Sequence, residues 1–363
     1  MDGIARKDPQ MTATSASKKV SGHPSHNENI SKTLPIVSIL LTMGGLIVLG
    51  WVGWSVLNPA PSPYHYQLVR EGSVEQFPEL GLSAVPDISV SKYELLSDGT
   101  EKPLVVLYVG EDSQIDIGPV LLEWQTQVNE PLITMEPSIT ELSTLMVAIT
   151  EYLPENALVL AWWDTSRRLK LLGNIDTLFY EHLSQPLLIP DVWRERRKSI
   201  ENTERQFWRV NDNATAEKEL FGRFREALLA DKVTGAAELR ALVGNRETYL
   251  ALHITDAYKL GIANPEQVGI GYKDFPNTGN LHTMSGHVKK WLKENEYISF
   301  SLEKLDATSI RVYFLTDPIS ADTLIAQALP FTSSKPFEIP DLSVVYQYGG
   351  YWVYKLLGND KTK

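Results

Sequence analysis

The sequence predicts an α/β protein in which a mixed sheet carries flanking helices and a helical insertion, preceded by one transmembrane helix. Three observations support this prediction. Residues 34–57 contain no charged side chain. Apolar runs at 104–109 and 157–163 read as buried strands, with a helical pattern between them. Apolar residues make up 43% of the 363 residues, enough for a substantial core.

The first segment, residues 1–33, is rich in Ser, Thr, Asn, Lys and Pro and has almost no large apolar side chains. Such a composition cannot offset the entropy of ordering, so we predict a disordered tail. The uncharged run 34–57 spans roughly 36 Å at about 1.5 Å per helical residue, enough to cross a bilayer. A cleaved signal peptide is disfavoured, because its apolar region has only about 7 to 15 residues.

Basic residues flank this predicted transmembrane helix unequally. Arg70 is the one basic residue in roughly the first 30 residues after it. Five precede it, namely Arg6, Lys7, Lys18, Lys19 and Lys32. We therefore predict a cytoplasmic N-terminus and a main domain on the far side of the membrane, which in a Gram-negative cell is the periplasmic side of the bacterial inner membrane. The proline-rich stretch 58–66 reads as a short stiff spacer.

Charge and cysteine content exclude several functions. The net charge is −11, and because residues 1–33 carry five basic and three acidic side chains, the remainder carries −13. Nucleic acid is excluded as a partner, since binding it requires clustered basic surface. The chain has no Cys, which rules out disulfides, zinc-thiolate sites, iron–sulfur clusters and covalent c-type haem. No cofactor is predicted.

The main domain is predicted to span residues 67–358, with a tail at 359–363. After the strand at 104–109 we expect helices at 119–128 and 138–153, then the strand at 157–163. Ser138 is the expected N-cap of the second helix, and Glu141 its capping-box partner. Strand, helix and strand in this order predict a βαβ unit with parallel strands.

The second half of the domain begins with a charge-dense segment, residues 191–245, which we predict to be a helical insertion. The elements expected after it are a strand at 249–254, a helix at 285–295, a strand pair at 297–305 and 310–316, and a final hairpin at 342–356. The hairpin is expected to turn at Gly349 and Gly350, because adjacent glycines accept the positive φ of a tight turn.

A candidate ligand site follows the buried strand at 157–163. Trp162, Trp163 and Asp164 lie at its carboxyl end, which is the edge where open α/β sheets usually bind ligands. Asp164 is also placed to cap the next helix, whose first N–H groups need acceptors. The carboxylate therefore has a ligand-binding and a structural interpretation, and the sequence leaves both open.

Two surfaces are candidates for partner binding. The first combines Arg and Trp, the residue types that dominate interface hot spots, and comprises Trp193, Arg194, Arg196, Arg197 and Trp208. The second is a basic helix face with Lys289, Lys290 and Lys293, suited to anionic lipid or an acidic partner. A solvated helix face explains either set as well.

No catalytic or metal-binding residues are predicted. His282 and His287 are five residues apart, which fits neither spacing of a helical metal site. His253 lies on an apolar strand, where a core histidine with its hydrogen bonds made is the preferred interpretation. No pattern orders a nucleophile with a base, so an enzyme is the less favoured reading.

The segment around Trp162-Trp163-Asp164 resembles the Trp-Trp-Asp signature of oligosaccharyltransferase catalytic subunits. The closing residues 349–355 are similar to the final hairpin of their soluble domains. In that family catalysis needs acidic metal ligands between many membrane helices. This chain has one predicted membrane helix, and Thr165-Ser166 replaces the family's Tyr-Gly. The resemblance therefore implies fold and not transferase activity.

A second resemblance spans most of the chain. The single N-terminal anchor, the run 161–179 and the stretch 190–194 are similar to the hydroxylamine oxidation protein HaoB family, which is encoded beside octahaem hydroxylamine oxidoreductase. The resemblance implies an anchored accessory protein that docks hydroxylamine oxidoreductase or its periplasmic cytochrome c partners. It implies no catalytic residues. The alternative is a domain or enzyme that binds a small molecule or peptide at Trp162, Trp163 and Asp164.

Overall fold

The computed structural model describes residues 33–57, 60–82, 88–100, 102–126, 138–183, 189–211, 213–277, 279, 281–305 and 307–357. The predicted tails, apart from Thr33, and the start of the predicted spacer lie outside these residues. The chain divides into two compact units, Met1–Pro59 and Ala60–Lys363. The first contains helix α1, Thr33–Leu57. Within the described residues, no helix has the length and hydropathy needed to cross a membrane.

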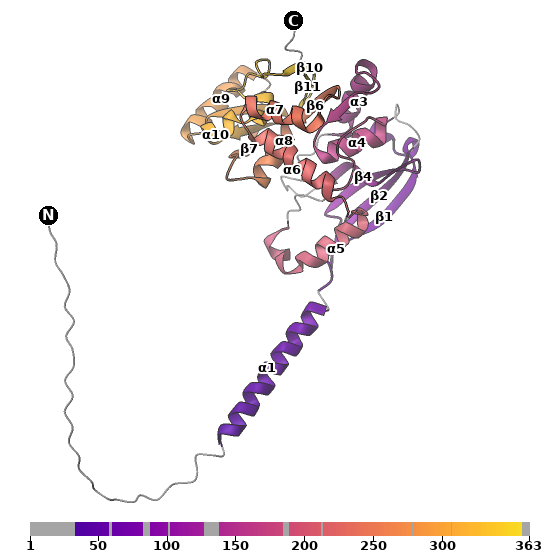
Figure 1. The fold of residues 1–363 in the computed structure, drawn as a ribbon, viewed down its shortest axis with the longest axis vertical. Helices are drawn as coiled ribbons and strands as arrows, with labels where there is room; N and C mark the ends of the chain where they lie inside the picture. The colour runs from indigo at the N-terminus through magenta and orange to yellow at the C-terminus, as the bar shows by residue number, and fades with distance from the viewer. Residues whose placement is uncertain are drawn as a thin grey trace, which may run out of the picture. The chain divides into compact units, whose positions relative to one another are not determined.

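The second unit is a mixed α/β fold with three sheets (Figure 1). The first sheet is an antiparallel meander in the order β1-β2-β3-β4. Its strands are β1 Tyr64–Ser73, β2 Ser89–Ser97, β3 Val105–Asp112 and β4 Ile115–Thr126. Short 3₁₀ helices η1 Val74–Gln76 and η2 Pro78–Leu80 follow β1.

The strand predicted at 104–109 is confirmed as part of β3, but the helix predicted at 119–128 is wrong. Residues up to 126 form β4, which pairs with β3 across a tight turn, and residues 127 and 128 lie outside the described chain. The apolar run in β4 fits the periodicity of a helix as well as that of a strand, and its pairing with β3 makes it a strand. The βαβ unit predicted from β3 is also wrong, because β3 lies in an antiparallel sheet.

The central sheet has the order β10-β11-β6-β5. Strand β5 Leu158–Leu160 runs parallel to β6 Thr248–His253, while β11 Tyr351–Leu356 runs antiparallel to β6. Strand β10 Leu342–Tyr348 forms the predicted C-terminal hairpin with β11, turning at Gly349 and Gly350. Gly349 has φ +56°, the left-handed conformation that this turn requires.

Alternate residues of the central sheet enter two different cores, as the period of two in a strand dictates. Leu160 and Leu252 face a core built with α6 Thr215–Leu229, α7 Lys232–Val243, α8 Ile254–Ala263 and α11 Leu324–Ala328. Val159 and Ala251 face the other core, with the meander, α3 Ile139–Tyr152 and α4 Trp163–Gly173. This burial on both faces accounts for the continuous apolar runs in the sequence.

The predicted cap of α3 is confirmed, since the Ser138 side chain accepts the backbone N–H of Glu141. Residues 191–243 of the predicted insertion form η3 Asp191–Arg196, α5 Arg197–Phe207, α6 and α7. Trp208 and Phe207 pack against Leu107 and Val109 of β3. The meander is therefore covered on both faces.

The third sheet is antiparallel, in the order β7-β9-β8, with β7 Ile270–Pro276, β8 Ser299–Lys304 and β9 Ser309–Leu315. The strand pair predicted for β8 and β9 is confirmed. Helix α9 Leu281–Glu294 packs Val288 and Leu292 against Phe300, Val312 and Phe314. A short helix, α10 Pro318–Asp322, follows β9.

Candidate functional site

Two parallel strands, β5 and β6, end side by side, and a helix follows each of them almost at once. Trp162 is the N-cap residue of α4, and His253 is the N-cap residue of α8. The prediction that Trp162, Trp163 and Asp164 follow the carboxyl end of a buried strand is confirmed. This edge is also where the N-termini of two helices, with their unpaired N–H groups, come together.

The carboxylate of Asp164 is the centre of a buried ionic cluster. Its Oδ2 accepts a hydrogen bond from Lys259 Nζ of α8 at 2.7 Å and lies 3.6 Å from Arg168 Nη2 of α4. Its Oδ1 accepts the backbone N–H of Thr165 at 2.6 Å. The Asp164, Arg168 and Lys259 side chains are 17%, 2% and 8% exposed. Asp164 therefore joins α4 to α8, and Trp162, not Asp164, is the N-cap.

Two carboxyl groups in this cluster have opposite pKa shifts. Burial disfavours ionisation of Asp164, but attraction by Lys259 and Arg168 is larger and holds its pKa well below the usual range. Burial raises the pKa of Asp256 to about 6, against the attraction of Lys259. Asp256 is 1% exposed, and its Oδ2 accepts the backbone N–H of His253 at 2.8 Å, which completes the capping box of α8.

His253 connects the cluster to the C-terminal hairpin. Its Nδ1 accepts the backbone N–H of Thr255 at 3.2 Å, and its ring lies 4.6 Å from that of Tyr351. Its Nε2 lies 3.5 Å from Glu141 Oε1, which accepts the Gly350 N–H at 2.5 Å. Burial opposes ionisation of Glu141, but its contact with His253 lowers its pKa. His253 is fully buried, as predicted for a core histidine, but among the described residues its Nε2 has no hydrogen-bond partner, so the expectation that its hydrogen bonds are made is wrong for that atom.

Arg167 of α4 is also buried, and it faces β4. Its Nη2 donates to two backbone carbonyls of β4, at 2.6 and 2.8 Å, and burial lowers its pKa to about 10. The His182 ring lies between two indoles, with centroids 4.7 Å from Trp163 and 5.4 Å from Trp208. Burial, together with the positive charge of Arg167, lowers the pKa of His182 to about 3. The ring is therefore neutral at ordinary pH.

The three predicted ligand-binding residues have different environments. Trp162 is 1% exposed and packs edge-on against Phe221 at 5.1 Å, so it belongs to the core. Trp163 is partly exposed beside His182. Asp164 is occupied by Lys259 and Arg168. A ligand at this edge would contact Trp163 first, and ligand binding at all three residues stays a prediction.

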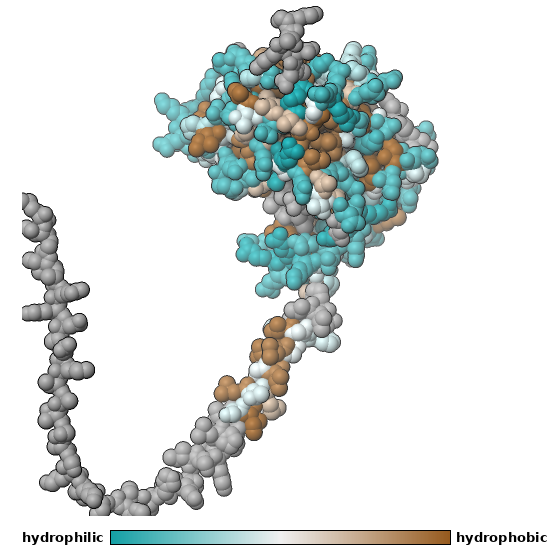
Figure 2. Space-filling view, in the orientation of Figure 1, coloured by the Kyte–Doolittle hydropathy of each residue, from teal (hydrophilic) through white to brown (hydrophobic). Residues whose placement is uncertain are grey.

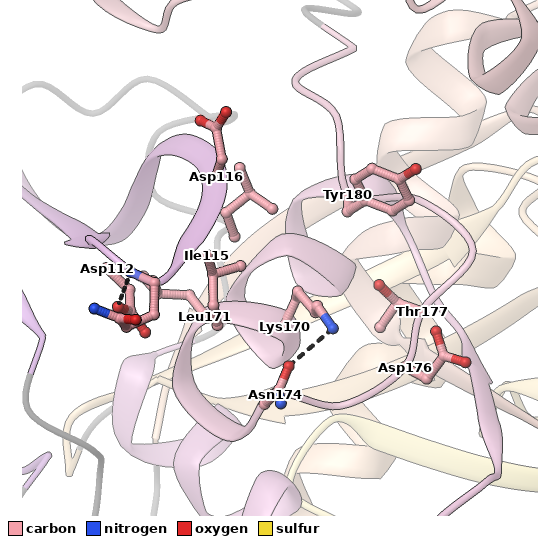
Figure 3. Close-up of a pocket in the computed structure, with 11 residues that line it drawn as sticks. Asp112, Ile115, Asp116, Lys170, Leu171, Asn174, Asp176, Thr177 and Tyr180 are labelled. Carbon is pink, nitrogen blue, oxygen red and sulfur yellow. Dashed lines mark hydrogen bonds between the residues drawn. The ribbon is translucent and has the colours of Figure 1, made fainter.

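A separate cavity of about 660 Å³ lies near the other end of α4 (Figure 3). Figure 3 shows Lys170 hydrogen-bonded to Asn174, with Asp112 and Asp116 across the opening and Asp176 beside Thr177. The Lys170 Nζ to Asn174 Oδ1 distance is 2.9 Å. The wall of the cavity combines three carboxylates with apolar side chains such as Ile115 and Leu171. Among the described residues, no group of three or more His, Asp or Glu side chains is placed to hold a metal ion.

The first predicted partner surface lies on η3, α5 and the turn after it. Trp208 is 6% exposed and donates its indole N–H to Glu204 at 2.9 Å, while Trp193 packs against Tyr64 at 5.4 Å. The arginines face solvent in ion pairs. These pairs are Arg194 with Asp191, Arg196 with Asp98 at 3.2 Å, and Arg197 with Glu201 at 2.7 Å.

The second predicted partner surface lies on α9. Lys289, Lys290 and Lys293 are exposed, and Lys290 is 3.8 Å from Glu294. The opposite face of the helix is buried against the third sheet. Partner binding at either surface stays a prediction.

Sequence reasoning missed Lys259, Arg168 and Asp256, which complete the ionic cluster. Charged side chains are normally assigned to solvent, so the burial of these three gave no local signal, and helix α8 itself was not predicted. The apolar residues around them, with Ile254, Ala257 and Leu260 buried on α8, could have suggested that this helix is covered on several sides.

These features define a class of protein. Its described residues form an α/β fold with three sheets, and the site at the carboxyl ends of β5 and β6 is filled by the protein's own buried ion pairs. A family model described as "HaoA-associated protein HaoB" matches residues 30–356, and the chain belongs to that family. The family resemblance found in the sequence is therefore confirmed.

Comparisons with other known proteins add little. No curated protein matches the chain. Among solved structures, the chain is similar to the C-terminal domain of PglB from C. jejuni, with a TM-score of 0.34 and 10% identity over 59% of this chain and 98% of that one. That score is too low to support an argument about fold or function.

Proposed function

We propose that this protein is a membrane-anchored periplasmic accessory protein of hydroxylamine oxidation that docks hydroxylamine oxidoreductase or its cytochrome c partners. The observation that carries the proposal is the family match over residues 30–356, because the family is described as associated with HaoA, the hydroxylamine oxidoreductase. In this proposal the buried charges at the ends of β5 and β6 stabilise the fold, and the partner binds to exposed residues on the surface.

The proposed anchor is the uncharged run 34–57, which forms most of α1. Its described apolar side chains are exposed, as the brown surface in Figure 2 shows. Leu41, Trp51 and Trp54, for example, are 72%, 70% and 68% exposed. A helix that is apolar on all sides needs an apolar environment, and a bilayer supplies one. The excess of basic residues before the run supports a cytoplasmic N-terminus.

The proposed docking surface is the exposed face of α9. Lys289 and Lys293 lie one helical turn apart and carry two positive charges on a domain whose net charge is negative. Exposed charges of this kind raise the rate of encounter with an oppositely charged surface more than they raise affinity. Tethering to the membrane confines both partners to a thin layer, so a weak interface is sufficient.

The test uses the full chain in lipid nanodiscs, mixed with purified hydroxylamine oxidoreductase and separated by gel filtration. Haem absorbance and protein mass are followed together. We expect co-elution that weakens with salt, because interactions between exposed charges are screened. The double variant Lys289→Glu, Lys293→Glu should bind at least about tenfold more weakly, because reversing both charges turns attraction of an acidic surface into repulsion and slows the encounter. The matched variant Lys102→Glu, Lys335→Glu, with the same change in charge, should bind as the natural chain does.

Two outcomes would contradict the proposal. If nanodisc-bound chain and oxidoreductase elute separately at tens of micromolar, with periplasmic cytochromes c also failing to bind, docking is wrong. If both double variants bind equally, docking does not use α9, and the arginines of η3 and α5 become the next surface to change.

A further inference from the structure

We propose that η3 and α5, residues 191–207, form a lipid-binding surface that rests on the headgroups of anionic phospholipids. The inference goes beyond the proposed function, and it depends on the anchoring part of that proposal. Three independent features of these residues support it: where they join the start of the domain, which side chains they expose, and the sign of their charge.

The first feature is the position of α5 beside the first residues of the domain. Ser199 donates its hydroxyl to the backbone carbonyl of Ala60. Glu204 accepts hydrogen bonds from the hydroxyls of Tyr64 and Tyr66 at 2.6 and 2.7 Å. Because these tyrosines lie on β1, α5 is held against the segment through which the chain enters the domain.

The covalent chain places this segment close to the proposed anchor. Ala60 follows the uncharged run 34–57 by three residues, and three residues extend at most about 11 Å. If the run spans a bilayer, Ala60 is within about 11 Å of the end of that span, and Ser199 of α5, which is hydrogen-bonded to Ala60, is within reach of the headgroups.

The second feature is the orientation of α5 within the domain. Ile200 is 2% exposed, and the Phe207 ring stacks on that of Tyr66 at 3.7 Å, so one face of the helix is fixed against β1. The opposite face, at half-turn positions, carries Lys198 and Arg205. Both residues are exposed.

The third feature is the composition of η3. Val192 is 86% exposed and is followed by Arg194, whose side chain is 77% exposed. Residues 191–207 carry five basic and four acidic side chains, and the basic excess lies in 191–198, which is η3 with the first two residues of α5, in a domain that is otherwise strongly acidic. An exposed apolar side chain beside cations suits the boundary between headgroups and acyl chains.

Nearby carboxylates do not neutralise this surface. Asp191 pairs with Arg194, Asp98 with Arg196 and Glu201 with Arg197, but these arginines are 77%, 39% and 67% exposed. Ion pairs at such exposed positions contribute little and exchange readily. Lipid phosphates can therefore replace the carboxylates as partners of the guanidinium groups, and bidentate Arg–phosphate pairing favours that exchange.

The experiment uses the absence of cysteine in this chain. Asn202→Cys, on the outward face of α5, and the control Ser343→Cys, on β10 at the other end of the domain, each carry a fluorophore (Figure 1). The full chain is reconstituted in phosphatidylcholine vesicles with or without phosphatidylglycerol, and a lipid with a spin-labelled headgroup serves as quencher.

We expect the label at position 202 to be quenched at least about twofold more than the label at 343, and only when phosphatidylglycerol is present. Adding Lys198→Glu and Arg205→Glu should remove the difference, while Lys102→Glu and Lys335→Glu should leave it. Equal quenching at the two positions would overturn the proposal, as would quenching at 202 that does not depend on lipid charge.

Alkaline extraction of the same vesicles separates failure of this inference from failure of the anchor. A chain that resists extraction but shows no excess quenching at 202 is anchored and does not use α5, so the inference alone falls. A chain that alkali releases is not anchored, and the inference falls with the anchor. Binding of hydroxylamine oxidoreductase is measured separately and decides neither result.

Discussion

Replacing Asp164 with Asn tests whether the charge cluster holds the fold together. Asn keeps the volume and can still accept the Thr165 N–H, but it leaves Lys259 and Arg168 without their carboxylate. Removing one partner of a buried ion pair costs about 3–5 kcal/mol, because the remaining charge stays desolvated. Since the pair here is only slightly exposed, we expect a loss near 3 kcal/mol, about 5–10 °C in Tm for a domain of this size.

The assay is thermal unfolding of the full chain at pH 7, followed by circular dichroism. Glu338→Gln is the matched control, because it removes the carboxylate of an exposed pair with Lys335, and its Tm should not change measurably. The variant Lys259→Met and the double variant complete a double-mutant cycle. The double variant should lose less than the sum of the single losses, since it buries one cation fewer than Asp164→Asn alone.

The result that would refute this reasoning is a loss below about 1 kcal/mol for Asp164→Asn, the value of an exposed pair. Additivity in the cycle would also refute it. Asp164 would then be dispensable for folding, and its ligand-binding interpretation would gain weight. Binding of a small molecule or peptide that is abolished at unchanged Tm would establish that interpretation.

Three further predictions follow from the same region. The pKa of Asp256 is about 6 in the folded protein and 3.8 in the unfolded chain, so its contribution to stability declines as pH rises from about 4 to 6. Over this interval the Tm of the natural chain should therefore fall relative to that of Asp256→Asn. A Tm difference between the two proteins that does not change with pH would contradict this prediction. With a pKa near 3, His182 should show no NMR titration between about pH 4 and 8, and any shift there would count against its burial. Gly350→Ala puts a Cβ 2.2 Å from His253 Nε2 and should lower the free energy of unfolding, measured in urea, by about 1–3 kcal/mol. In the control Gly222→Ala the new Cβ has nothing within 4 Å, so stability should rise slightly. Equal effects of the two substitutions would rule out the clash.

Local sequence signals correctly predicted the elements whose residue pattern is compatible with only one type of secondary structure. The cap at Ser138, the glycine turn at Gly349 and the strands β8 and β9 follow from residue types that act within a few positions of themselves. Strand β4 could not be predicted in this way, because its apolar run fits a helix as well as a strand. Its pairing with β3 determines that it is a strand.

Long-range pairing also explains why the site was only half predicted. Trp162 and Asp164 could be placed at the end of a buried strand from the sequence around them. The charge that pairs with Asp164 comes from Lys259, on a helix that becomes a neighbour only because β6 pairs with β5. Nothing in the spacing of these residues indicates that pairing. Likewise, Glu141 was expected to complete a capping box, but its side chain instead accepts the Gly350 N–H of the C-terminal hairpin.

The position of Lys259 bears on how this fold can be used. In open α/β sheets the carboxyl ends of parallel strands collect helix N-termini, and a ligand commonly takes up their unpaired N–H groups. Here Asp164 and Asp256, together with the ring of His253, accept those N–H groups, and Lys259 neutralises the added charge. A ligand that enters this edge has to displace an ion pair that is almost wholly buried. A partner proposed to bind the outer faces of α9 and α5 would meet exposed cations and would displace only water and weak surface pairs, and this difference in cost supports the docking proposal.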